Sequence, residues 1–262
     1  MPEPSRNHLK NLASLHRRKG RREHGLFLVE GIRLVRAAVE AGAQLTEILI
    51  EHELSGEAQL RASFEAAGVP IHVVARKELA HLSNVQHGQG VIAVAQSVVA
   101  EATDGLERAR TVLALDGVQD PGNVGALVRT AAWFGVDVVL AGPGTADLEN
   151  PKVVRGSMGG LWDVRLVRAD DLGAALEILS QNGMTITGAD LGGQRAREWK
   201  AGREGVLVLG NEAHGISDGV RARLDHRVSL LPKRPAEGRG VESLNVVVAG
   251  GILMERWLGR SA

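Results

Sequence analysis

The sequence predicts an α/β protein with two successive α/β units, the second of them built on a mainly parallel sheet. Short apolar runs rich in Val, Leu and Ile alternate with stretches whose apolar residues recur at the helical period. The alternation breaks between residues 96 and 110, where Thr103-Asp104-Gly105 is the weakest point. Strands that alternate with helices favour a parallel sheet whose ligands bind outside the carboxyl ends of the strands. The loops that follow strands are therefore the places where we expect chemistry.

The N-terminal unit is predicted over residues 1–98, a common size for a domain. Ile32, Val35 and Val39 form the apolar stripe of its first helix, which Gly42 ends. Residues 99–110 are interpreted as a linker with a short helix. The strands are expected at residues 26–29, 47–50, 71–74 and 90–95, and the helices at residues 31–41 and 57–67.

The C-terminal unit is predicted over residues 111–262. Asn123 is expected to cap a helix that continues to residue 134. A final helix over residues 244–258 is apolar nearly all round, so we expect it to be buried. The strands are expected at residues 111–115, 136–140, 163–167, 184–188, 205–209 and 226–230, with helices between them.

Composition limits the possible classes of protein. The chain has no cysteine, which excludes disulfides and thiolate metal sites, and no metal site is expected. No run of about 18 apolar residues suits a membrane span, and the first residues lack the apolar core of a secretory signal. These features favour a cytoplasmic protein without a membrane partner.

A strongly basic stretch lies at residues 16–24 and is compatible with nucleic-acid binding. Such clusters neutralise phosphates, which supply most of the sequence-independent affinity of proteins for nucleic acids. A solvated loop without a ligand is the alternative. Tyr is absent and other aromatic residues are few, so binding would depend on charge rather than on stacking. The residues expected to contact RNA are Arg17, Arg18, Lys19, Arg21 and Arg22.

The first polar loop follows the strand at residues 111–115 and ends at Asn123. In the helix after it, Arg129 shares a face with Gly125 and Ala132, because helical residues advance by about 100°. Small neighbours leave room for a ligand beside the guanidinium, whose fork suits phosphate oxygens. A capping Asn123 and an Arg129 paired with a structural carboxylate would explain the same residues.

Two further loops carry polar residues. After the strand at residues 205–209, Glu212 follows Gly210, which permits a tight turn; alternatively, Glu212 caps the next helix. The third loop ends at Ser243, a potential helix cap. No Gly-x-Gly-x-x-Gly pattern follows a predicted strand, which argues against an ordinary dinucleotide site.

Taken in this order, the three loops resemble the SpoU-type ribose 2′-O-methyltransferases of the SPOUT superfamily. The first family motif, Asn-x-Gly-x-x-x-Arg-Thr-Ala, is matched by residues 123–131. The second is matched by Leu209-Gly210-Asn211-Glu212 with Gly215, and the third by Leu231-Pro232 followed by Ser243-Leu244-Asn245-Val246. An intermediate signature lies at residues 152–159. The resemblance spans residues 111–258, and the N-terminal unit is similar to L30e-like substrate-binding domains.

This resemblance implies an α/β knot (a trefoil-knotted, mainly parallel sheet), a homodimer, and S-adenosylmethionine as the cofactor. It implies methyl transfer to a ribose 2′-hydroxyl, with ribosomal RNA preferred because a separate binding domain suits a large structured target. Transfer RNA is the alternative substrate, and a non-catalytic RNA-binding or ribosome-assembly factor is the alternative function. The implied catalytic residues are Arg129, Asn123, Glu212, Ser243 and Asn245. The implied cofactor-binding residues are Leu209, Gly210, Asn211, Leu230, Leu231, Ser243 and Leu244.

The third motif departs from the family pattern at two points. Lys233 stands where a hydrophobic residue is usual, and residues 234–240 lengthen the loop, which bears on target preference more than on the reaction class. Family schemes give the motif arginine a part in deprotonation. Since the guanidinium of arginine is a poor proton acceptor in proteins, we expect Arg129 to hold the acceptor phosphate instead.

Overall fold

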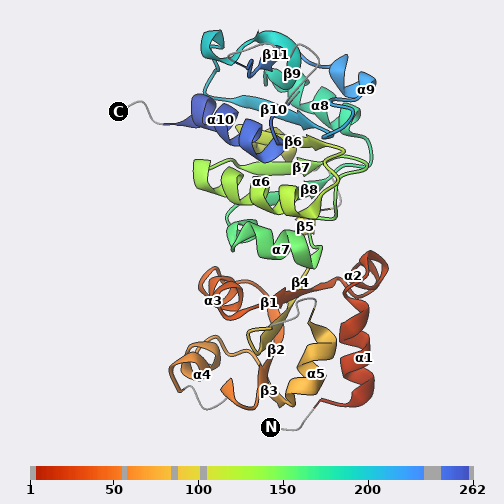
Figure 1. The fold of residues 1–262 in the computed structure, drawn as a ribbon, viewed down its shortest axis with the longest axis vertical. Coiled ribbons are helices and arrows are strands. Elements are labelled where there is room, and N and C mark those ends of the chain that lie inside the picture. Colours follow the sequence, from red (N-terminus) through yellow and green to blue (C-terminus); the bar gives the residue numbers. More distant parts are fainter. Residues whose placement is uncertain (1–3, 55–57, 84–87, 101–104, 233–242, 260–262) are drawn as a thin grey trace.

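The computed structural model describes residues 4–54, 58–83, 88–100, 105–232 and 243–259. These form two α/β units, drawn one above the other in Figure 1, with helix α7 (Pro151–Ser157) beside their contact. The predicted fold class is confirmed, and a trefoil knot in the path of the chain stays a prediction. None of the helices in these ranges is long and apolar enough to cross a lipid bilayer.

The N-terminal unit contains a mixed four-stranded sheet in the order β1-β4-β2-β3. Strand β4 pairs antiparallel with β1 and β2, whereas β2 and β3 are parallel. The strands are β1 (Leu26–Glu30), β2 (Leu45–Glu51), β3 (Ile71–Val74) and β4 (Val91–Gln96). All four lie where apolar runs predicted them.

Helices cover both faces of this sheet. They are α1 (Arg6–Ser14), α2 (Arg18–His24), α3 (Ile32–Glu40), α4 (Ala58–Glu65) and α5 (Arg76–Leu82). The sequence predicted α3 and α4 but not α1, α2 and α5, which are short and mostly polar. Leu12, Leu79 and Leu82 pack on one face of the sheet, and Val35 and Phe64 pack on the other.

The C-terminal unit contains a seven-stranded sheet in the order β11-β9-β10-β6-β7-β8-β5, in which every neighbouring pair is parallel. The strands are β5 (Val99–Ala100), β6 (Thr111–Asp116), β7 (Val138–Ala141), β8 (Arg165–Arg168), β9 (Ile186–Arg195), β10 (Gly205–Gly210) and β11 (His226–Ser229). Strands β6 to β11 were predicted.

The segment interpreted as a linker contributes to this sheet. Strand β5 pairs with β8 at one edge, and a 3₁₀ turn, η2 (Leu106–Arg108), follows it. The division of the chain at residues 98 and 110 stays a prediction, and Thr103 and Asp104 lie outside the described residues.

Five helices cover the C-terminal sheet. They are α6 (Pro121–Phe134), α7, α8 (Leu172–Gln181), α9 (Asp218–Arg221) and α10 (Val246–Leu258). Leu113 and Leu115 of β6 pack with α6, α7 and α10, whereas Val112 and Ala114 pack with α8 and α9. Since neighbouring residues of a strand point to opposite faces, β6 is buried on both sides, as is usual in parallel sheets.

Helix α10 is not buried all round, and that prediction is wrong. Leu253 and Met254 are buried against the sheet, but Val248 is 50% exposed and Ile252 is 39% exposed. One apolar stripe of this helix therefore faces outward.

Candidate functional site

The three polar loops meet through their side chains. Asn123 Nδ2 donates a hydrogen bond of 2.8 Å to Glu212 Oε1, and Asn245 Nδ2 donates one of 3.3 Å to Asn123 Oδ1. Asn123 lies in the first turn of α6, Glu212 in the loop after β10, and Asn245 at the start of α10. The structure thus joins one predicted catalytic residue from each loop, and we call these three residues the polar triad.

Asn123 is available for the triad because another residue caps α6. The N-cap is Asp120, whose side chain accepts from the backbone N–H of Asn123 at 3.0 Å, so the predicted capping role of Asn123 is wrong. Lys152 of α7 lies 3.2 Å from the other oxygen of Asp120. The hydrogen bond from the Asn123 backbone, followed by that from Lys152, lowers the pKa of Asp120 below its usual value and keeps the cap charged.

Glu212 joins the second loop to the first. Its Oε2 accepts from the backbone N–H of Gln119 at 3.4 Å, in addition to the bond from Asn123. It caps no helix, since α9 begins after Ser217. The carboxylate is exposed, but each of its two oxygens accepts a hydrogen bond from the first loop.

The turn around Asn211 fixes the place of Glu212. Asn211 Nδ2 donates to the carbonyl oxygen of Gly117 at 2.7 Å, and its Oδ1 accepts from the backbone N–H of His214 at 3.0 Å. Asn211 and Gly215 also exchange two backbone hydrogen bonds of 2.9 Å. A Cβ on Gly210 would collide with the backbone of Gly215, so this tight turn requires glycine.

Asn245 is the N-cap of α10, and its Oδ1 accepts from the backbone N–H of Val247 at 2.9 Å. The alternative role of Ser243 as this cap is therefore wrong. Ser243 is exposed. Residues 233–242, which include Lys233 and the long insertion, lie outside the described residues.

Arg129 is exposed on α6, between one and two turns beyond Asn123. Its side chain has no hydrogen-bond or ion-pair partner within the part of the chain that the structure describes, which leaves the structural-carboxylate alternative without support. Its backbone is held closely, because a Cβ on Gly160 would lie 3.2 Å from Arg129 Cα. The Arg129 side chain therefore extends from a closely packed part of the backbone.

The predicted cofactor residues lie at the carboxyl ends of β10 and β11 and at the start of α10. Leu209 is buried, whereas Leu231 is 51% exposed and Leu244 is 47% exposed. Exposed apolar side chains beside backbone polar groups suit a flat heterocycle such as adenine. Their role in binding S-adenosylmethionine stays a prediction.

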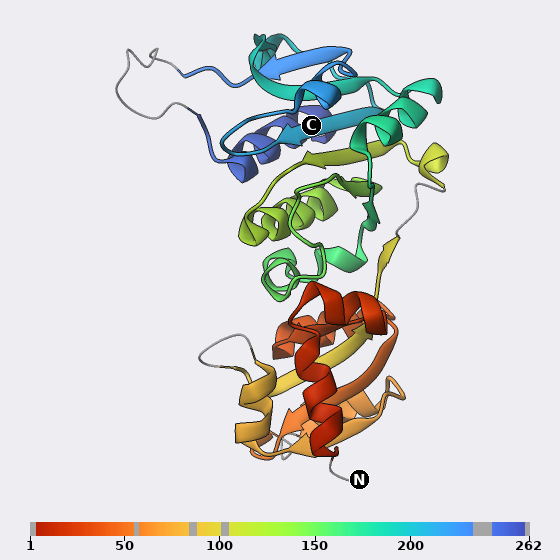
Figure 2. The ribbon, with the colours of Figure 1, turned by 90° about the vertical axis from the view of Figure 1, so that its right-hand side faces the viewer.

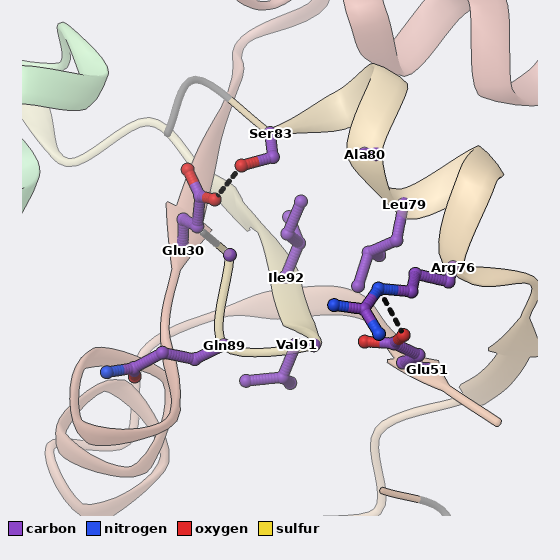
Figure 3. A pocket seen from close by; sticks show the side chains of 11 residues that line it. Glu30, Glu51, Arg76, Leu79, Ala80, Ser83, Gln89, Val91 and Ile92 are labelled. Carbon is purple, nitrogen blue, oxygen red and sulfur yellow. Dashed lines mark hydrogen bonds and ion pairs between the residues drawn. The ribbon is translucent and has the colours of Figure 1, made fainter. Parts of the chain in front are cut away.

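A small cavity in the N-terminal unit was not predicted. It measures about 120 Å³ and lies between α5 and the ends of β1, β2 and β4 (Figure 3). Its carboxylates have partners: Glu30 accepts a hydrogen bond from Ser83, and Glu51 lies 3.4 Å from Arg76 Nε. The cavity is separate from the polar triad.

The basic stretch is helical, and one of its residues is not available to RNA. Arg21 is 3% exposed, and its guanidinium donates to the carbonyl oxygens of Leu15 and His16 and to Asp147. The prediction that Arg21 contacts RNA is therefore wrong. Its partner Asp147 lies 126 positions away in the sequence, so the basic stretch alone did not reveal this ion pair. The exposed lysine and arginine residues of the stretch, here called the basic patch, are Arg17, Arg18, Lys19 and Arg22.

The parallel sheet and the polar loops at the carboxyl ends of its strands define the class of protein, an α/β enzyme. Residues 110–255 match the SpoU rRNA Methylase family, and residues 6–93 match the MRM3-like substrate binding domain. The chain belongs to the SpoU rRNA methylase family. It is thus an S-adenosylmethionine-dependent RNA methyltransferase, and the predicted family, enzyme class, cofactor and N-terminal substrate-binding unit are confirmed.

Similar proteins extend over nearly the whole chain. The 23S rRNA (guanosine(2553)-2'-O)-methyltransferase RlmP of Bacillus subtilis (strain 168) is 30% identical over 247 residues, which cover 94% of each chain. The 23S rRNA (guanosine-2'-O-)-methyltransferase RlmB of Coxiella burnetii is also 30% identical, over 86% of this chain and 92% of that protein. A solved structure from Porphyromonas gingivalis, assigned to the TrmH family of RNA methyltransferases, has a TM-score of 0.84 at 32% identity and covers 99% of this chain and all of that one.

Proposed function

We propose that this enzyme methylates a ribose 2′-hydroxyl of ribosomal RNA, and that the polar triad marks its active site. The hydrogen bonds that join Asn123, Glu212 and Asn245 across 122 positions of sequence carry this assignment. The ribosomal target is supported by the names of the RlmP and RlmB relatives. Transfer RNA is the second candidate, and the cytoplasm, where ribosomes lie, is the proposed place of action.

The cofactor would be held by the loop ends around the triad. When bound, S-adenosylmethionine supplies an activated methyl group, so the protein must mainly align the acceptor with it. Leu231 and Leu244 would cover the apolar part of the cofactor. The full proposed set is Leu209, Gly210, Asn211, Leu230, Leu231, Ser243 and Leu244.

The acceptor nucleotide would be positioned by charge and hydrogen bonds. The guanidinium of Arg129 would bind the phosphate beside the acceptor ribose and so hold the hydroxyl in place. Glu212, fixed by Asn123, would accept hydrogen bonds at the sugar, and Ser243 and Asn245 would complete the rim. The hydroxyl proton would pass to a phosphate oxygen or to water.

A homodimer would form through α6 and α10. Trp133 of α6 is 83% exposed, and Val248 and Ile252 form the exposed stripe of α10, a helix that packs on α6. Large exposed apolar side chains on two helices that pack on each other support a protein interface there. Because Arg129 lies one turn before Trp133, the interface would border the active site.

The basic patch would hold the RNA backbone. Its four exposed cations can displace counterions from phosphates, so RNA binding should weaken steeply with salt. Neutralising all four should reduce the magnitude of the slope of log K against log salt by about 3 to 4, at roughly 0.7–0.9 per phosphate contact. An unchanged slope would exclude the patch as the RNA-binding surface.

The test of the function is transfer of labelled methyl groups to ribosomal and transfer RNA, followed by mapping of the 2′-O-methylated nucleotide. Arg129→Ala should lose most turnover while its melting temperature stays unchanged. The matched control is Arg197→Ala, because Arg197 is exposed and pairs only with its neighbour Glu198 among the described residues. Near-normal methylation by Arg129→Ala would contradict the role of Arg129, and absence of ribose methylation by the wild type would contradict the function.

A further inference from the structure

The contact between the two units is built around α7 and the loop before it. In Figures 1 and 2, this helix lies between the C-terminal sheet and the N-terminal unit, and it packs against β1. The intermediate sequence signature at residues 152–159 lies here. This segment belongs to the C-terminal unit, but some of its residues contact the N-terminal unit.

Asp147 is the centre of the first contact. It lies 2.6 Å from Arg21 of the N-terminal unit and 3.2 Å from Arg168 of β8. All three side chains are about nine-tenths buried or more. Burial alone would raise the pKa of Asp147, but the hydrogen bond and charge of Arg21, with help from Arg168, lower it below its usual value. The carboxylate therefore stays charged within the contact.

Glu149 forms the second contact. Its Oε1 accepts from Ser97 Oγ at 2.6 Å and from the backbone N–H of Val98 at 2.9 Å. Ser97 and Val98 directly follow β4. Glu149 therefore fixes the chain at the point where it leaves the N-terminal unit.

Arg155 of α7 forms the third contact, 3.6 Å from Glu30 at the end of β1. Glu30 is the carboxylate that accepts from Ser83 in Figure 3. Close beside it, a Cβ on Gly159 would lie 3.1 Å from the methyl group of Ala37 in α3. The backbone at Gly159 therefore lies close to α3, with no room for a larger side chain.

The same helix also touches the active-site helix. A Cβ on Gly125 of α6 would lie 2.6 Å from the carbonyl oxygen of Val153 and 2.9 Å from Gly156 Cα. Lys152 pairs with Asp120, the N-cap of α6. Helix α7 is therefore in direct contact with the helix that carries Asn123 and Arg129.

Ion pairs of this kind fix geometry more than they add stability. Domains joined by one chain move relative to each other unless their interface holds them. Buried charged pairs have a high desolvation cost, and their directional hydrogen bonds are satisfied in one arrangement only. A contact that combines the buried ion pair of Asp147, the two hydrogen bonds of Glu149 and the longer ion pair of Arg155 therefore favours one orientation of the units.

We propose that the contact centred on Asp147, Glu149 and Arg155, here called the domain clamp, determines which nucleotide is methylated. It holds the RNA-binding unit at one distance and angle from the polar triad, so RNA bound by the basic patch brings a single ribose to Arg129. This inference rests on the proposed function. It makes the clamp residues specificity determinants that touch neither cofactor nor substrate.

The experiment compares full-length Asp147→Asn and Arg155→Met with the wild type. Arg155 is 30% exposed, so its variant tests the clamp even if Asp147→Asn fails to fold. Glu204→Gln is the matched control, because Glu204 pairs with Arg110 in an exposed position within one unit. Solution X-ray scattering reports the spread of orientations, calorimetry reports S-adenosylmethionine binding, and sequencing maps every methylated nucleotide.

We expect the clamp variants to bind S-adenosylmethionine as the wild type does but to sample a wider range of interdomain distances. Their kcat/KM at the wild-type nucleotide should fall by about 10²-fold, because a displacement of roughly 1 Å can cost that much, and methyl groups should appear at neighbouring nucleotides. A clamp variant that keeps the wild-type nucleotide and kcat/KM would overturn the proposal, whether or not its scattering changes. A wild type that methylates no ribose would instead refute the proposed function.

Discussion

The substitution Gly125→Ala tests the packing of α6 on α7. A Cβ at this position would lie 2.6 Å from the carbonyl oxygen of Val153 and 2.9 Å from Gly156 Cα. Both are backbone atoms, which cannot rotate away, so the helices must separate. Overpacking of this kind costs up to about 3 kcal/mol, and the better helix propensity of alanine offsets about 1 kcal/mol. The net loss is about 2 kcal/mol in the free energy of unfolding.

Thermal unfolding measures this loss. At about 2–4 °C per kcal/mol for a chain of this size, the melting temperature should fall by about 4–8 °C. The matched control is Gly251→Ala in α10, the other helix packed on α6, where the nearest atom to a new Cβ is the Thr130 methyl group at 3.8 Å. That variant should gain about 0.5–1 kcal/mol. Equal melting temperatures for the two variants would refute the packing argument.

Three further predictions follow from the site and the clamp. Asn123→Ala removes the link between the loops, so turnover should fall by about 10²-fold with little change in melting temperature; turnover within twofold of the wild type would contradict the triad. Asp120→Ala removes the N-cap of α6 and should cost about 1 kcal/mol in denaturant unfolding; no loss would show that the cap is dispensable. Burial raises the pKa of Glu149 above its ordinary value of 4.5, so the wild type loses stability as the pH rises above 4.5 through the raised pKa. Glu149→Gln has no titratable group at this position, so its free energy of unfolding should increase relative to that of the wild type across this pH range. A difference in free energy of unfolding that does not change with pH would be inconsistent with a raised pKa of Glu149.

The sheet strands were predictable because burial on both faces leaves continuous apolar runs such as residues 205–209. The polar loops were predictable because parallel strands end at one edge, which is where the structure joins Asn123 and Glu212. Helix α2 was not, since it has no apolar residue. Helix α1 was missed although Leu9, Leu12 and Ala13 form a short apolar stripe on it, because polar residues surround that stripe.

Local patterns also misassigned single residues. Asp120 and Asn123 can both cap a helix, and the deciding signal was Pro121, which favours the first helical position and so points to the residue before it as the cap. The burial of Arg21 depends on Asp147, 126 positions away, and the exposed stripe of α10 depends on what covers the helix. A single sequence carries neither kind of information.

The two-residue strand β5 gives the segment between the units a protective role. It covers the outer side of β8, and a sheet edge left without such cover is open to pairing with other chains. A fragment that began at residue 110, where the SpoU match starts, would lack this cover and the Ser97 and Val98 partners of Glu149. The methyltransferase fold therefore includes residues upstream of its family signature, and truncation at that boundary would yield a polypeptide prone to self-association.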